Sequence, residues 1–121
     1  MTKRREADNG AIMMYRKCIL ENITKREIAY LLGENVYLSD NSFDPRNIVL
    51  NEADNCVYAY GQPVARVDGD TIFSYTLGYN VATIDGNTIR VIANQTETYE
   101  ILEGDECTNL EKAALYIGAR R

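Results

Sequence analysis

Val64-Ala65-Arg66-Val67-Asp68-Gly69-Asp70-Thr71-Ile72 is a stretch of the chain that recurs, with few changes, as Val81-Ala82-Thr83-Ile84-Asp85-Gly86-Asn87-Thr88-Ile89. Asp-Gly between runs of β-branched and apolar residues is a strong signal for a β-hairpin, because the central positions of its turn need a positive φ. The repeat therefore predicts two consecutive hairpins centred on Asp68-Gly69 and Asp85-Gly86. In this register Val67 pairs with Asp70, and Ile84 pairs with Asn87.

Side chains alternate along these strands, which predicts one apolar face and one mixed face. The apolar face, which we expect to form the core, carries Ala65, Val67, Ile72, Ala82, Ile84, Ile89 and Val91. The mixed face carries Val64, Arg66, Thr71, Phe73, Tyr75, Val81, Thr83, Thr88, Arg90 and Ile92. The mixed face is either the solvated side of an antiparallel sheet or a binding surface for an anionic ligand that contains a ring. The sequence leaves both interpretations open.

Two other stretches carry the signal of a helix N-terminus. Thr24-Lys25-Arg26-Glu27 matches a capping box, and the apolar residues that follow it predict a helix over residues 25–32 with Gly33 as its terminator. Thr108-Asn109-Leu110-Glu111 is a second capping box. It opens a predicted C-terminal helix that ends at Gly118 and whose apolar stripe is Leu110, Ala113, Ala114 and Ile117.

The order of elements predicts the fold class. We expect residues 1–10 to form a flexible N-terminal arm, and Ala11 to Leu20 to form a strand that is apolar on both faces. Such a strand contacts a partner subunit or lies covered in the middle of a sheet. With the remaining strands, the sequence predicts a single α+β domain over residues 11–121. In this domain two α-helices pack on one face of an antiparallel β-sheet meander of about six or seven strands.

Composition argues against several functional classes. The chain of 121 residues has a net charge of −5, which disfavours binding to DNA or RNA duplexes, because that affinity comes from neutralising phosphates. It contains no histidine, no Cys-x-x-Cys spacing and no phosphate-binding glycine motif, so we expect no enzyme activity, metal or cofactor. An enzyme built on a cysteine or on a pair of carboxylates is the alternative that this composition leaves open. No apolar run approaches a membrane span, and the three separated cysteines suit a reducing compartment. We therefore expect a cytoplasmic protein that does not enter a membrane.

The chain holds nine tyrosines and no tryptophan. Tyrosine offers contact area with a polar tip at a low cost in entropy, and it is enriched where surfaces bind. Several tyrosines lie near Arg66 and Arg90 in the predicted meander, and a guanidinium can both pair with a phosphate and stack on a ring. These residues predict a site that binds a small nucleotide without chemistry.

Three features of the sequence occur together: Tyr15-Arg16-Lys17 precedes the segment from Asn22 to Gly33, the central Val64-Ala65-Arg66-Val67-Asp68-Gly69-Asp70 follows, and Ser74-Tyr75-Thr76-Leu77-Gly78-Tyr79 comes next. In these features, and in its size, the chain resembles the first class of Thoeris anti-defence proteins, which are phage proteins that sequester cyclic ADP-ribose-type signals. The resemblance implies a homo-oligomer, a dimer or larger, with recessed pockets between its subunits. It also implies that a cyclic ADP-ribose isomer or a cyclic oligonucleotide is held intact, which blocks bacterial anti-phage signalling in the infected cell.

The pockets of that family are formed by arginines, an aromatic ring and an asparagine. The candidates for these groups on this chain are Arg66, Phe73, Tyr75, Arg90 and Asn94.

A competing interpretation is an acidic protein-binding inhibitor, similar to the anti-CRISPR proteins that mimic nucleic acid. It rests on a group of carboxylates close together in the sequence: Glu97, Glu100, Glu103, Asp105 and Glu106. Such a group is also typical of a solvated edge. A protein that sequesters a signal releases the intact ligand on heating, whereas a mimic has bound none.

Overall fold

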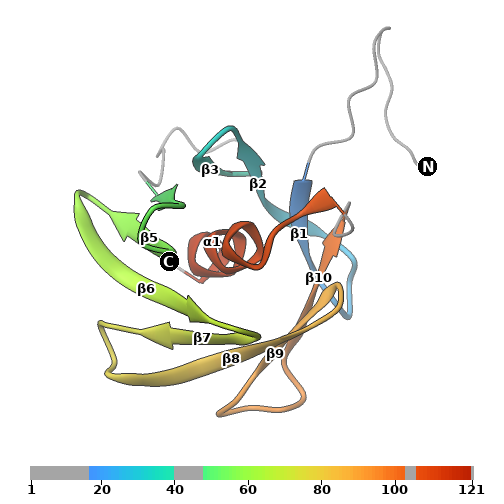
Figure 1. The fold of residues 1–121 in the computed structure, drawn as a ribbon. Coiled ribbons are helices and arrows are strands. Elements are labelled where there is room, and N and C mark those ends of the chain that lie inside the picture. Colours follow the sequence, from blue (N-terminus) through green and yellow to red (C-terminus); the bar gives the residue numbers. More distant parts are fainter. Residues whose placement is uncertain (1–16, 40–47, 103–105, 121) are drawn as a thin grey trace, which may run out of the picture.

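The computed structural model describes residues 17–39, 48–102 and 106–120, which form ten β-strands and one α-helix. In chain order these elements are β1 (Lys17–Glu21), β2 (Glu27–Leu32), β3 (Asn35–Leu38), β4 (Ile48–Asn51), β5 (Cys56–Ala59), β6 (Gln62–Asp68), β7 (Thr71–Ser74), β8 (Tyr79–Asp85), β9 (Thr88–Val91), β10 (Thr98–Leu102) and α1 (Asn109–Ala119). Consecutive strands pair antiparallel, and β1 also pairs with β10, so the sheet closes into a barrel. Figure 1 shows the strands surrounding α1.

The closed barrel corrects the predicted α+β fold, in which six or seven strands formed an open meander under two helices. The meander is present, but closure depends on β1, where Cys18 lies opposite Leu102 on β10 and opposite Tyr30 on β2. Open and closed meanders share the same alternation of side chains, so periodicity carries no signal for closure. The predicted arm over residues 1–10 and the first part of the predicted strand that starts at Ala11 lie outside the described residues.

The two Asp-Gly hairpins form as β6–β7 and β8–β9, and each turn lies one residue later than predicted. Asp68 pairs with Thr71, so Gly69 and Asp70 are the central residues of the first turn, and the second turn is shifted in the same way. Gly69 has a φ of +60°, and glycine at the first central position is the preference of a type II′ turn. The predicted pairing of Val67 with Asp70, and its counterpart in the second hairpin, is therefore wrong.

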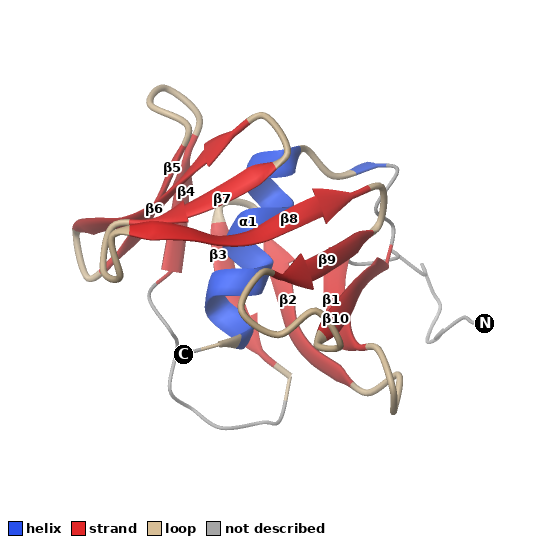
Figure 2. Cartoon of the chain, turned by 90° about the horizontal axis from the view of Figure 1, so that it is seen from below, coloured by secondary structure: helices blue, strands red, loops and turns tan. Residues whose placement is uncertain are grey.

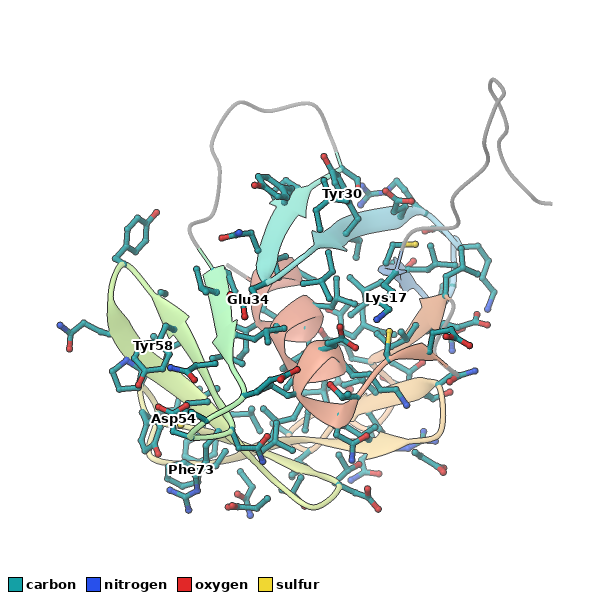
Figure 3. The ribbon with its side chains drawn as sticks, turned by 45° about the horizontal axis from the view of Figure 1, so that its top comes forward. Lys17, Tyr30, Glu34, Asp54, Tyr58 and Phe73 are labelled. Atoms are coloured by element: carbon teal, nitrogen blue, oxygen red, sulfur yellow. The ribbon has the colours of Figure 1, made fainter. Side chains whose placement is uncertain are left out.

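This shift leaves the predicted faces unchanged, because it moves each partner by two positions and side chains alternate with a period of two. The predicted core face is confirmed, since the structure buries Ala65, Val67, Ile72, Ala82, Ile84, Ile89 and Val91. Arg66, Phe73 and Arg90 are half-buried on the opposite, outer face. Figure 3 shows Phe73 on the outside of the barrel wall.

The predicted helix over residues 25–32 is wrong, because most of this segment is strand β2. A turn precedes the strand: the Lys25 amide donates to the Glu21 carbonyl oxygen at 2.7 Å, and Lys25 has a φ of +61°. The Thr24 amide and hydroxyl donate to Glu21 Oε1, three residues earlier in the chain, at 2.8 and 2.7 Å. In a capping box the Thr24 side chain would instead accept from the amide of Glu27. The capping-box pattern at Thr24 therefore belongs to a tight turn between two strands.

Helix α1 begins at the predicted capping box, which is confirmed. Thr108 Oγ1 accepts from the Glu111 amide at 3.1 Å, and Glu111 Oε1 accepts from the Thr108 amide at 2.9 Å. The predicted end at Gly118 is wrong, because the helix continues to Ala119. A Cβ at Gly118 would lie 2.6 Å from Val36 Cγ1 on β3, so glycine here allows the helix to approach the barrel wall closely.

Helix α1 lies inside the barrel and does not cover one face of a sheet. Figure 2 shows strands passing both in front of the helix and behind it. Its buried residues occupy all sides: Leu110, Lys112, Ala113, Ala114, Leu115, Tyr116 and Gly118. Such a position suits a helix that is apolar or small on every side. Lys112 is a polar member of this set, and its Nζ donates to the Gly86 carbonyl oxygen at 2.6 Å.

The β5–β6 turn contains a backbone position that a substitution can relax. Its central residues, Tyr60 and Gly61, have φ values of +54° and +79°, as a type I′ turn requires. A left-handed conformation costs a non-glycine residue roughly 1–2 kcal/mol, and asparagine tolerates it better. Because the Tyr60 side chain is exposed, we expect Tyr60→Asn to raise the free energy of unfolding by roughly 0.5–1 kcal/mol in urea denaturation. The β-branched variant Tyr60→Val should lower it, and a destabilised Tyr60→Asn would contradict the turn assignment.

Candidate functional site

Three of the five predicted site residues lie together on the outer side of the β6–β7 hairpin: Arg66 on β6, Phe73 on β7 and Tyr75 directly after β7. Arg66 and Phe73 are cross-strand partners, and the Arg66 Cζ atom lies 4.3 Å from the centroid of the Phe73 ring. The same Cζ atom lies 5.6 Å from the centroid of the Tyr75 ring. The two rings meet edge to face, with centroids 5.5 Å apart. Arg66, Phe73 and Tyr75 therefore form one cation–π cluster, which we call the outer cluster.

The guanidinium of the outer cluster already has a carboxylate partner. Arg66 Nε lies 2.9 Å from Asp68 Oδ2, and both side chains are partly accessible to solvent. Hydrogen bonds to Tyr75 and, as the smaller effect, to Asp68 raise the pKa of Arg66. A guanidinium has five N–H donors, so Arg66 keeps donors for a ligand although its charge is partly compensated.

Arg90 and Asn94 lie apart from the outer cluster. Arg90 is on β9, three strands from Arg66 on β6, which corresponds to roughly 14 Å across the sheet at a strand spacing of about 4.8 Å. Asn94 Oδ1 accepts from the Thr96 hydroxyl at 2.8 Å and from the Thr96 amide at 3.3 Å, which makes it a turn-forming residue. The structure thus brings together Arg66, Phe73 and Tyr75, and it places the other two candidates elsewhere on the barrel.

A pocket of about 400 Å³ opens at one mouth of the barrel. We call it the mouth pocket. Its lining is mostly apolar and comes from β6, the end of β7, the β7–β8 turn, the start of β8, the end of β9 with the residues after it, and the C-terminal end of α1. Barrel mouths are common positions for ligand sites, and this volume is in the usual range for small-molecule pockets. Three residues of the lining are large apolar side chains exposed to solvent: Leu77 (56%), Tyr79 (54%) and Ile92 (39%).

Two buried residues that carry a hydroxyl group, Ser74 and Tyr116, belong to the lining of the mouth pocket. Ser74 is 6% exposed, and its Oγ accepts from the Leu77 amide at 3.0 Å. Tyr116 is 3% exposed and meets Tyr99 edge to face, with ring centroids 5.8 Å apart. Within the described part of the chain, no residue accepts the Ser74 hydroxyl proton, and none is hydrogen-bonded to the Tyr116 hydroxyl. Burial raises the pKa of Tyr116, and the nearby Arg120 cation opposes this effect only in part.

Arg120 contributes the cation at the rim of the mouth pocket. Its guanidinium forms an ion pair with Glu97, and its Nη1 lies 3.5 Å from the Tyr99 hydroxyl oxygen. The Tyr99 hydroxyl in turn donates to Glu97 Oε2 at 2.5 Å. Contacts with Tyr99, Tyr116 and Glu97 raise the pKa of Arg120, so it stays charged. Because Glu97 compensates this charge, the rim is close to neutral.

Some of the carboxylates that suggested an acidic protein-binding inhibitor form ion pairs within the chain. Glu97 pairs with Arg120, and Glu100 Oε1 lies 2.9 Å from Lys25 Nζ. The predicted members at positions 103 and 105 lie outside the described residues. Paired carboxylates present less free negative charge to a partner than the sequence alone indicates.

The sequence did not indicate the mouth pocket, because its lining comes from segments far apart along the chain. One local signal was present: Leu77 is a large apolar residue in the β7–β8 turn, where polar residues are usual, and the exposed Tyr79 follows at the start of β8. Across residues 17–39, 48–102 and 106–120, no three side chains of Cys, Asp or Glu lie close enough together to hold a metal ion. Within the described residues, α1 is the helix, and it lacks the length and apolar character needed to cross a membrane.

Comparison with protein-family models, curated proteins and solved structures finds no match to the chain.

Proposed function

We propose that the protein binds a small molecule in the mouth pocket and holds it without chemical change. The observation that carries this proposal is the combination of an open pocket of about 400 Å³, a mostly apolar lining and two buried hydroxyl-bearing residues, Ser74 and Tyr116, in that lining. Ligand sites typically join an apolar cavity to a few well-placed polar groups. The described lining includes no carboxylate or thiol, and the chain has no histidine, so the usual general bases are not at the pocket.

A neutral fluorescent probe tests this proposal directly. We expect N-phenyl-1-naphthylamine to bind at one site per chain, with an emission increase as the dye leaves water. Ala93 is exposed at the pocket rim, so Ala93→Trp should fill the mouth with little effect on the fold and weaken probe binding at least tenfold. Ala53→Trp makes the same change at an exposed position in the β4–β5 turn and should bind as the wild type does. Equal affinities of the two tryptophan variants would contradict the mouth pocket as the site.

A second candidate function is sequestration of a cyclic nucleotide signal, which would block bacterial anti-phage signalling. The observation that favours it is the outer cluster, where a guanidinium with free donors lies beside two aromatic rings. A hydrogen bond to a charged group contributes roughly 1.5–3 kcal/mol, so Arg66→Ala should weaken binding about tenfold to a hundredfold. Calorimetry with cyclic ADP-ribose isomers and cyclic oligonucleotides measures this. No heat with any of these ligands would remove the candidate, and Ala93→Trp should leave such binding unchanged.

Self-association remains a prediction from the sequence. Each of the ten described strands already has two neighbours in the barrel, so any contact between copies through this wall uses side chains and not strand pairing. Sedimentation at high micromolar concentration distinguishes the monomer of 13.7 kDa from a dimer. A monomer at all concentrations would rule out a ligand site shared between subunits.

A further inference from the structure

The Tyr116 hydroxyl is the feature of the mouth pocket that points to a ligand. Buried tyrosine hydroxyls usually find a hydrogen-bond partner, and leaving a buried polar group without one is unfavourable. Tyr116 lines the pocket, and only 3% of its surface is exposed. Within the described residues its hydroxyl has no partner, so a group that enters the pocket can supply one.

Ser74 adds a second donor to the same pocket. It lies at the end of β7 with its side chain on the inner face of the barrel, and its oxygen already accepts from the Leu77 amide. The hydroxyl proton therefore remains available, and within the described part of the chain no residue accepts it. Both hydroxyls can donate, and burial keeps the Tyr116 hydroxyl protonated by raising its pKa. The complementary feature of a ligand is a hydrogen-bond acceptor.

The charges around the pocket argue for an uncharged ligand. Arg120 is the cation in the lining, and its ion pair with Glu97 compensates it. A carboxylate or phosphate that entered the mostly apolar pocket would lose its hydration and would have to compete with Glu97 for this guanidinium. An ammonium group would also lose its hydration, and the described lining holds no carboxylate to pair with it. Desolvation therefore disfavours either sign of charge.

We propose that the mouth pocket selects an uncharged ring compound that carries a carbonyl oxygen or ring nitrogen, which accepts hydrogen bonds from Ser74 and Tyr116. This inference rests on the proposed function and adds the class of ligand. Rings fill an apolar volume of about 400 Å³ with few rotatable bonds, and the acceptor removes the cost of the two unpaired donors. A pocket whose buried donors need an acceptor binds analogues without that acceptor less tightly, because the donors then stay unpaired.

Three matched probes test the inference: 2-acetylnaphthalene carries an acceptor, 2-ethylnaphthalene has nearly the same shape without one, and 2-naphthoate carries a negative charge. We expect the wild-type protein to bind the ketone more tightly than the hydrocarbon or the carboxylate. Tyr116→Phe and Ser74→Ala should each reduce the preference for ketone over hydrocarbon about threefold to tenfold. Affinity for 2-ethylnaphthalene should stay the same in both variants, which shows that the pocket is intact.

The outcomes separate the inference from the proposed function. If 2-ethylnaphthalene binds and the ketone preference is the same in the wild type and both variants, the inference is wrong and the proposed function stands. If no probe binds to the wild-type protein, the proposed function fails. Tighter binding of 2-naphthoate than of the ketone would replace the uncharged ligand with an anion held by Arg120. The free Tyr116→Phe protein should melt at the same Tm as the wild type or higher, whereas a hydroxyl with a structural role would lower the Tm on removal.

Discussion

Replacing Leu115 by alanine is expected to lower the free energy of unfolding by roughly 2–5 kcal/mol. Leu115 lies on α1 inside the barrel, and its side chain is fully buried. The shorter side chain leaves a cavity, and the wall cannot easily collapse into it because the strands are hydrogen-bonded into a closed ring. A typical domain has a total stability of about 5–15 kcal/mol, so this one substitution would remove a large share. Urea denaturation followed by circular dichroism measures the effect.

The control for Leu115→Ala is the same change at an exposed position. Leu32 lies at the end of β2 and is 55% exposed, and Leu32→Ala should change the free energy of unfolding by no more than about 0.5 kcal/mol. If both variants lost the same small amount of stability, helix α1 would not occupy the inside of the barrel.

The second large effect is expected at Gly118, where helix α1 approaches β3. A Cβ added there would lie 2.6 Å from Val36 Cγ1, and Val36 is itself buried. Overpacking of this kind costs roughly 1–3 kcal/mol, whereas the gain in helix propensity from glycine to alanine is at most about 1 kcal/mol. We expect Gly118→Ala to lower the free energy of unfolding by about 1–2 kcal/mol.

A double-mutant cycle identifies the cause of the Gly118→Ala effect. Val36→Ala removes the clashing Cγ1 atom and leaves the Val36 Cβ, which would be 3.5 Å from the new Cβ, an ordinary contact distance. In the Val36→Ala background, Gly118→Ala should therefore be neutral or stabilising. The coupling free energy between the two positions should exceed about 1 kcal/mol. Additive effects would show that the helix does not meet β3 at this point.

The parts of the fold that local chemistry determines were predictable from the sequence. The Asp-Gly repeat predicted two hairpins and the correct core face, although the turns lie one residue later. Thr108 and Glu111 predicted the start of α1, because a capping box uses only groups within one helical turn. In each case the signal and the structure it specifies lie within a few residues of each other.

The wrong predictions share a physical origin: local sequence signals are compatible with more than one structure, and tertiary contacts decide between them. The segment Glu27–Leu32 has only six residues, too few for the strand and helix periods to be distinguished. Its inward residues Ala29 and Leu31 fit a strand once β1 and β3 flank it. Placing α1 inside a barrel required knowledge of closure. The run of apolar residues from Ala113 to Ile117 was the available indication that the helix is buried on every side.

Only part of the candidate site could be predicted from the sequence, because some of its residues come together through tertiary contacts. Arg66, Phe73 and Tyr75 are near one another because they share one hairpin, and the sequence grouped them through that hairpin. Arg90 shares their face but lies three strands away, and the alternation of side chains along a strand carries no information about that separation. The mouth pocket combines Ser74 on β7 with Tyr116 on α1, and no local pattern links these two residues.

Closure of the barrel by β1 and β10 has a kinetic consequence. β1 is the first of the described strands and β10 the last, so the pair that closes the barrel joins two segments about 80 residues apart in the sequence. Contacts between residues so far apart in sequence slow folding, typically to milliseconds or seconds. Until the seam between Cys18 and Leu102 forms, both strands present unpaired edges that can recruit another chain. Refolding at high protein concentration is therefore expected to lose material to aggregation through this seam, although the finished wall offers no such edge in its described strands.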